Sequence, residues 1–219
     1  VGGAGSGETD SKVYVANTGG NAYIQIKGAD SSGTVGLKFG RNSVANRAGI
    51  DWSAATDALS FRTGGTTEAL RVDSSSRVLI GSTTQVNAFT DTVQIFKNTS
   101  TAAVTIKRAS DNAYAPYINF IKSRGTTANS VTVLQSGDLM GYIRFSGTDG
   151  TNTAESATIQ AAIDGTPGND DMPGRLMFST TADGAAGSTE RMRINKIGHI
   201  GINQQSPDTM LHLKGDPGS

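Results

Sequence analysis

Short runs in which apolar residues stand two positions apart recur along the whole chain. The clearest are Met192–Ile194, Ile200–Ile202 and Leu211–Leu213, which are separated by turn-like sequences rich in Gly, Asn and Pro. This alternation is typical of half-buried β-strands, whereas no stretch keeps an apolar period of 3.6 residues through three turns. We therefore predict an all-β chain with about 14 short strands.

The runs repeat along the chain. Glu68–Asp73 matches Glu190–Asn195 at a spacing of 122 residues, and Val78–Ile80 matches Ile200–Ile202 at the same spacing. Looser matches occur at two other spacings. At 80 or 81 residues, Val13–Val15 pairs with Val93–Ile95, Ile24–Ile26 with Val104–Ile106, and Leu37–Phe39 with Ile118–Phe120. At 117 or 118 residues, Leu59–Phe61 pairs with Leu176–Phe178, and Val93–Ile95 with Leu211–Leu213. The repeats predict a flexible lead-in at 1–10, a first β unit at 11–90, a second at 91–208 and the truncated start of a third at 209–219.

The second predicted unit is longer than the first. The jump in spacing from 81 to 117 implies roughly 36 extra residues, which we place in an insertion at about 125–174. The insertion contains three further period-two runs, at Val131–Val133, Ile143–Phe145 and Ile159–Ile163, and a Gly- and Pro-rich loop, Gly165–Gly174. Because the first unit has the flanking strands without it, we expect a β lobe outside the core of the repeat, and its loops are the best candidates for contact with a partner.

The composition indicates that this core is shared between chains. Only 36% of the 219 residues are hydrophobic and 28 are glycine, which is little material for one globular core. Each short strand offers a narrow apolar face and exposed edges, so we expect the faces to be buried in a closed assembly. The residues predicted to point at that shared core are Val72, Ile80, Ile194 and Ile202.

The stretch Pro173–Gly215 carries a composite pattern of G-R-L-x-F, a glycine-rich turn, E-R-M-R-I, G-x-I-G-I and S-P-x-x-x-L-x-L. In this pattern the chain resembles the distal shaft repeats of tailed-bacteriophage tail fibres, and looser copies extend the resemblance over most of Val13–Gly215. It departs from the pattern at Asn203, where another glycine is common, and at His199 in a turn.

The resemblance implies an elongated homotrimeric β fibre, with an intertwined or β-prism/β-helix-like shaft, located in the virion. Its function would be host-cell surface recognition and attachment, through a host surface glycan or an outer-surface protein. Such shafts are often followed by a C-terminal self-cleaving intramolecular chaperone, and no chaperone sequence is present in the chain.

Charge and composition narrow the possible partners. The chain has 19 basic and 19 acidic residues with no basic stripe, so nucleic acid is not expected as a partner. The longest apolar run is far too short to span a membrane, so membrane insertion is not expected either. Cysteine is absent, which excludes disulfides and thiol catalysis.

Few residues are suited to catalysis. Asp51, Asp164, Asp170 and Asp171 are the carboxylates from which a glycan-cleaving pair would have to be drawn. Aspartates are common in turns because they bond nearby backbone, and Asp170–Asp171 lacks the ligand spacing of a calcium loop. His199 and His212 are interpreted as solvent-facing surface residues. We therefore predict no enzyme activity, no metal and no cofactor.

Trp52, Tyr114 and Tyr117 are the side chains best suited to stacking on sugars, although Trp52 is expected to be buried. A pair of charges also repeats along the chain, Glu68 with Arg71 and Glu190 with Arg193, and for these charges we expect structural cross-strand or cross-chain pairing. The function predicted is a non-enzymatic segment of a phage tail fibre. The alternatives are a polysaccharide-cleaving tailspike and a bacterial surface adhesin repeat.

Overall fold

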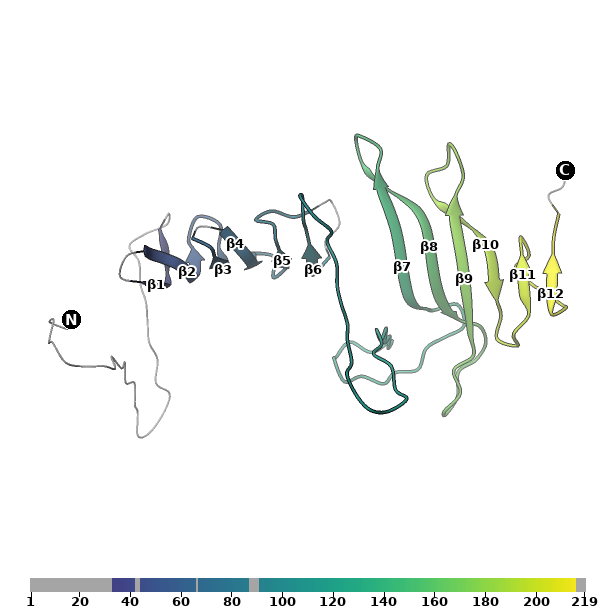
Figure 1. Ribbon diagram of the computed structural model, residues 1–219. Coiled ribbons are helices and arrows are strands. Elements are labelled where there is room, and N and C mark those ends of the chain that lie inside the picture. The colour runs from purple at the N-terminus through teal and green to yellow at the C-terminus, as the bar shows by residue number, and fades with distance from the viewer. Residues whose placement is uncertain (1–32, 42–43, 66, 87–90, 216–219) are drawn as a thin grey trace, which may run out of the picture. The chain divides into compact units, whose positions relative to one another are not determined.

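The structure is a computed structural model that describes residues 33–41, 44–65, 67–86 and 91–215. These residues form twelve β-strands and no helix, so the prediction of an all-β chain is confirmed. The chain divides into two units, Val1–Val104 and Thr105–Ser219, and each unit contains one six-stranded sheet (Figure 1). The predicted lead-in at 1–10 and the strands predicted at Val13–Val15 and Ala22–Ile26 lie outside the described residues.

The sheet of unit one consists of six strands that are neighbours in the order of the sequence. They are β1 (Thr34–Arg41), β2 (Val44–Ser53), β3 (Ala58–Thr63), β4 (Thr67–Val72), β5 (Val78–Ile80) and β6 (Val93–Ile95). The first four pairings are antiparallel, and β5 pairs with β6 in parallel. The parallel pair requires the chain to cross over between β5 and β6 rather than turn back in a hairpin.

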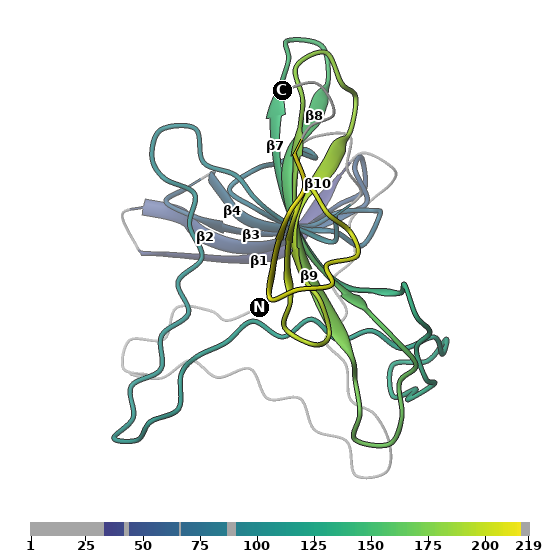
Figure 2. The same ribbon diagram turned by 90° about the vertical axis from the view of Figure 1, so that its right-hand side faces the viewer.

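The sheet of unit two has the same strand order and the same sequence of pairings. Its strands are β7 (Leu139–Thr148), β8 (Thr153–Ile163), β9 (Gly174–Thr181), β10 (Ser188–Ile194), β11 (Ile200–Ile202) and β12 (Leu211–Leu213). Four antiparallel pairings again precede one parallel pairing, between β11 and β12. In Figure 2 the strands of this sheet overlap, as expected for one layer viewed along the direction in which its strands follow one another.

The matching strands β4 and β10 each contain a β-bulge. The register with the preceding strand shifts between Glu68 and Leu70 in β4 and between Glu190 and Met192 in β10. A bulge inserts one extra residue into a strand, so residues three apart are turned toward the same face. Without it they would point to opposite faces.

Three predicted strands are wrong. The apolar alternation at Val104–Ile106, Ile118–Phe120 and Val131–Val133 is real, but none of these runs is a strand in the structure. Alternation favours an extended backbone, while a strand also requires a ladder of backbone hydrogen bonds to a neighbour. In the described part of the chain these runs have only a single such bond, from the N–H of Arg124 to the carbonyl of Thr132 at 3.3 Å.

Two further expectations need correction. Of the predicted insertion at 125–174, residues Leu139–Thr148 and Thr153–Ile163 are β7 and β8, which belong to the sheet and occupy the places that β1 and β2 have in unit one. The repeat matches left β7 and β8 without equivalents because Leu37–Phe39, in β1, was matched to Ile118–Phe120, which is not a strand. The polar sequence at 42–48 also predicts a loop, but β2 begins at Val44 and pairs with β1 from there.

Candidate functional site

One face of the sheet in unit one is apolar across all six strands. Residues that are opposite one another in the register share a face, and two such rows run from β1 to β6. The first row is Leu37, Ile50, Phe61, Leu70, Ile80 and Ile95, and the second is Val35, Trp52, Leu59, Val72, Val78 and Val93. Leu37 is 49% exposed, Phe61 40% and Val93 58%, so this face is open in the single chain.

Unit two has an apolar face of the same construction. Its rows are Ile143, Ile159, Phe178, Met192, Ile202 and Leu213, and Gly141, Ala161, Leu176, Ile194, Ile200 and Leu211. Leu211 is 53% exposed and Leu213 63%, and both belong to the last strand. We refer to these two sets of rows as the open apolar faces of units one and two.

The opposite face of each sheet is more polar and is covered by the chain itself. In unit one its central row runs through Asp51, Ser60, Arg71, Leu79 and Gln94, of which Leu79 is 1% exposed. Here the side-chain oxygen of Gln94 accepts the backbone N–H of Val86, from the crossover between β5 and β6, at 2.8 Å. In unit two the β11–β12 crossover lies directly over Gly201, where an added Cβ would overlap the carbonyl oxygen of Gln204.

This arrangement is the reverse of what an isolated soluble sheet requires. A stable domain buries the apolar face of its sheet against a second layer, and exposed apolar patches of this extent mark interaction sites. Among the described residues only six hydrophobic side chains are buried: Ala58, Leu79, Leu134, Ala162, Ile163 and Met177. The open apolar faces are therefore the principal candidate site.

The four residues predicted to line a shared core all lie in the rows of the open apolar faces. Val72 and Ile80 are opposite Leu59 and Leu70 in unit one. Ile194 and Ile202 are opposite Leu176 and Met192 in unit two. In the single chain Ile80 is 37% exposed and Ile202 40% exposed.

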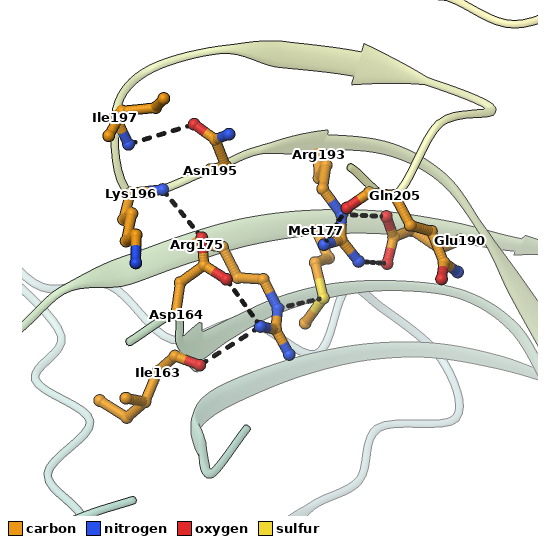
Figure 3. Close-up of polar contacts among 10 residues, drawn as sticks. All are labelled: Ile163, Asp164, Arg175, Met177, Glu190, Arg193, Asn195, Lys196, Ile197 and Gln205. Carbon is orange, nitrogen blue, oxygen red and sulfur yellow. Dashed lines mark hydrogen bonds and ion pairs between the residues drawn. The ribbon is translucent and has the colours of Figure 1, made fainter. Parts of the chain in front are cut away.

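The repeated charges form ion pairs within one strand rather than between neighbouring strands of the sheet. Arg71 donates to both oxygens of Glu68 at 2.8 and 2.7 Å, and Arg193 donates to those of Glu190 at 2.5 and 2.6 Å. The bulge makes this possible by turning the two side chains to one face. These hydrogen bonds raise the pKa of both arginines, and in unit two Arg193 also donates to the carbonyl of Gln205 in the crossover at 2.7 Å (Figure 3).

Asp51 is engaged in the sheet and is not placed as a catalytic acid. Its side chain contacts Lys38 of β1 and Arg62 of β3 as an ion pair on each side, and the residue is 2% exposed. Burial acts to raise the pKa of Asp51, but the hydrogen bonds and charges of Arg62 and Lys38 lower it below its usual value. The carboxylate is thus a fixed charge that ties three strands together.

Asp164 has a similar structural role in unit two. One of its oxygens accepts a hydrogen bond from Arg175 at 2.9 Å and the other accepts the backbone N–H of Lys196 at 3.0 Å (Figure 3). Burial acts to raise its pKa, and these bonds lower it below the usual value. Asp170 and Asp171 are exposed in the loop that precedes β9. Among the described residues no three His, Asp or Glu side chains are grouped so that they could hold a metal ion.

Of the three aromatic residues that are candidates for sugar contact, Trp52 is more exposed than the sequence predicts. Trp52 is 41% exposed on the open apolar face, and its indole N–H donates to Asp57 at 3.1 Å. The sequence predicts that it is buried, but no other described part of the chain covers Trp52 on this face. Tyr114 and Tyr117 are 76% and 79% exposed, and the guanidinium of Arg108 lies 5.6 Å from the ring centre of Tyr114.

The two histidines are half-buried rather than solvent-facing. His212 lies in the row of the covered face, where its Nδ1 is 2.7 Å from Asp208 and its Nε2 is 3.3 Å from the side-chain nitrogen of Gln204. Its proximity lowers the pKa of Asp208. The alternation of Leu211, His212 and Leu213 correctly predicts that His212 lies on the face opposite the two leucines. The same alternation carries no information on the crossover that covers that face.

No known protein family matches the sequence, and no curated protein does. Solved structures do match. The carboxy-terminal domain of the bacteriophage T5 L-shaped tail fibre is similar over 91% of this chain and 91% of that one, with a TM-score of 0.68 and 15% sequence identity. The form of that domain with its intramolecular chaperone domain matches with a TM-score of 0.69 and 16% identity, over 91% of this chain and 62% of that one.

The fold is therefore that of a phage tail-fibre domain, which agrees with the resemblance found in the sequence. The chain spans less than two thirds of the form that carries the chaperone domain. Separately, the part of the chain that the structure describes holds no helix long and apolar enough to cross a membrane.

Proposed function

We propose that this chain is a structural segment of a phage tail fibre that assembles as a parallel homotrimer in the virion and serves attachment to the host surface. The observation that carries the proposal is the inverted burial of both sheets. In each unit the polar face is covered by the chain's own crossover, while two rows of apolar side chains are left open. Three copies that turn these faces toward one axis would bury them, and symmetric closure would leave no face for further addition.

The two sheets are, in this proposal, successive copies of one repeating unit of the shaft. The shared strand order, the equivalent bulges and the equivalent ion pairs support this reading. The limits predicted from the sequence, 11–90 and 91–208 with a truncated third unit from 209, follow the same repeat. The extra residues of the second unit would then lie mainly before β7 and in its longer strands.

The proposal includes attachment without catalysis. Two of the candidates for a glycan-cleaving pair, the buried Asp51 and the half-buried Asp164, are engaged in ion pairs with neighbouring basic side chains. Contact with the host would be made by exposed residues. Tyr114 and Tyr117 are such residues, and the loop Gly165–Gly174 borders a groove of about 560 Å³ together with residues 121–134.

A pair of matched substitutions tests the trimer. Ile202→Asp places a carboxylate on the open apolar face, and in a trimer it would bury three such charges near one axis, at a cost of several kcal/mol each. Ile197→Asp changes the same residue type in the turn before β11, where the side chain is 65% exposed. By light scattering we expect three times the chain mass of 22.6 kDa for the unchanged chain and for Ile197→Asp, and loss of the trimer for Ile202→Asp.

A chain mass of one monomer in light scattering would be the contradicting result. If the chain is a folded monomer at micromolar concentration, the open apolar face faces water, and both isoleucine substitutions should be harmless. That outcome would refute the trimer.

A further inference from the structure

The segment Thr105–Ser123 of unit two has an extended backbone that bonds to nothing else in the described part of the chain. None of its residues belongs to a strand, and none makes a backbone–backbone hydrogen bond there. The one backbone group with a partner is the N–H of Tyr114, which donates to the side chain of Asn112 at 3.2 Å. Figure 1 draws the segment as a long coil without an arrow.

The side chains of this segment are those of a strand. Ile106, Tyr114, Tyr117, Ile118, Phe120 and Ile121 are all between 49% and 83% exposed. At roughly 200 Å² for each such side chain, they offer on the order of 800 Å² of surface per chain, which is the share of one partner in a stable protein interface. The alternating runs of β7 to β12 in unit two, by contrast, are paired in the sheet.

The segment has two arms that are able to pair. Arg108 and Asn112 hold a local turn through a hydrogen bond of 2.9 Å, and Pro116 lacks the N–H that a strand ladder needs. The stretches left for pairing are Thr105–Ala109 and Tyr117–Ser123. The backbones of these two stretches form no hydrogen bond with one another within this chain.

The second arm is continuous with the open apolar face of unit two. Phe120 lies against Gly141 of β7, where an added Cβ would be 3.2 Å from the Cβ and Cγ of the phenylalanine. Gly141 begins the apolar row that continues through Ala161, Leu176 and Ile194. Phe120 thus packs over this row at the edge strand β7, so whatever covers the rest of the open apolar face also reaches this arm.

We infer that the arms Thr105–Ala109 and Tyr117–Ser123 pair as β-strands with the same segment of the other copies of the chain. This inference rests on the proposed trimer and names the segment through which its chains exchange backbone hydrogen bonds. Pairing between copies satisfies the unbonded N–H and C=O groups of the arms. It also joins their exposed side chains to the interface that the open apolar faces form.

Amide hydrogen exchange on the purified chain, without any host component, tests the inference. The turn Ala182–Gly187 between β9 and β10 serves as the exposed reference. If the arms are paired between copies, their amides should exchange at least about 100-fold more slowly than those of this turn. Light scattering on the same sample reports whether the trimer is present.

The two possible failures are distinguishable. A trimer whose arm amides exchange as fast as the reference turn would overturn the inference and leave the trimer standing, with the arms then free for a host component or another fibre protein. A monomer would overturn the proposed function and this inference together.

A proline substitution provides a second test. Ile118→Pro removes an N–H that no atom of the described chain accepts, so it should be harmless if the arm is unpaired. If the arm is a strand between copies, the substitution should abolish the protection of Tyr117–Ser123. Asp183→Pro is the matched control, because it occupies the second position of a turn whose third residue, Gly184, has a φ of 77° and which accepts proline.

Discussion

The turns after β4 in unit one and after β10 in unit two have the same hydrogen-bonding geometry but begin with different residues. In the turn after β4, one oxygen of Asp73 accepts the N–H groups of Ser75 and Arg77, both at 3.0 Å. In the turn after β10, Asn195 accepts those of Ile197 and His199 at 3.1 and 2.9 Å. Either residue serves because only a short side chain with an acceptor oxygen is required.

The two sheets differ more at the centre of the covered face. The middle position is Leu79 in β5 and Gly201 in β11, and both are buried. In unit one the leucine side chain fills the space. In unit two the crossover comes so close, through Gln204 and Pro207, that no side chain fits. The same burial is thus achieved by a side chain in one unit and by backbone in the other.

The charge on the covered face differs as well. At the place in β2 where unit one has Asp51, opposite Ser60, unit two has Gln160 opposite Met177. Asp51 therefore bridges β1 and β3 as a charged group, whereas Gln160 donates to Thr158 of its own strand at 3.0 Å. This difference teaches that the repeat preserves the pairing and the open apolar face more strictly than it preserves the covered face.

The largest expected effect comes from Leu79→Ala. The leucine is 1% exposed, and truncating a buried leucine typically costs about 2–5 kcal/mol in the free energy of unfolding. Trp52 is the only tryptophan, so its fluorescence during urea unfolding at one fixed protein concentration reports on unit one. As a control, Val86→Ala changes a residue that is 43% exposed and should cost less than about 0.5 kcal/mol.

A loss below about 1 kcal/mol for Leu79→Ala would show that the crossover of unit one can close over the site, as that of unit two does. The comparison between the two central positions would then describe a flexible crossover, not two fixed solutions.

A smaller effect is expected from acid, and it should separate the two units. The pKa of Asp51 is lowered in the folded chain, so its contribution to stability is full above the unfolded pKa of about 3.9 and is lost as the pH falls through the folded value. Asp51→Asn should cost about 1–3 kcal/mol at pH 7, because Lys38 and Arg62 lose their partner. It should also reduce the further loss below pH 4.

The measurement is again unfolding followed by Trp52 fluorescence, from pH 7 to pH 3. The matched change in unit two is Gln160→Ala, followed by the amide exchange of β8. It removes no charge and should leave the acid dependence of that unit as it was. An unchanged acid profile in Asp51→Asn would show that other carboxylates dominate it.

Much of this structure could be predicted from the sequence, because strand alternation and the repeat are local patterns. The pairs Glu68–Asp73 with Glu190–Asn195 and Val78–Ile80 with Ile200–Ile202 fall on matching strands, β4 with β10 and β5 with β11. The charges at Glu68 and Arg71 are three residues apart, so both reach the same face only if the strand contains a bulge. This signal of the bulge is missed when every strand is assumed to be regular.

The remaining errors concern what lies next to a segment. Ile118 and Phe120 alternate as strand residues do, yet their hydrogen-bonding neighbour is not in the described chain. Ile143 and Ile159 were assigned to an insertion although they lie in a row of the sheet. A single sequence gives the conformation that a run prefers, while its partner depends on distant residues or, in our proposal, on other chains.

The smallest effect expected concerns the left-handed residue of the two Asx turns. Ser76 has a φ of 61° and Gly198 a φ of 83° at equivalent places. A residue with a Cβ is strained there by about 1–2 kcal/mol, whereas glycine loses about 0.5–1 kcal/mol through the entropy of the unfolded chain. Ser76→Gly should therefore stabilise unit one by a few tenths to about 1 kcal/mol, measured by Trp52 fluorescence, and Gly198→Ser should destabilise unit two by a similar amount, measured by amide exchange of β10 and β11. Nothing lies within 4 Å of a Cβ added at Gly198, so its cost would come from the backbone alone. If Ser76→Gly destabilises instead, the serine contributes an interaction that the glycine of unit two does without, and the two turns are not equivalent.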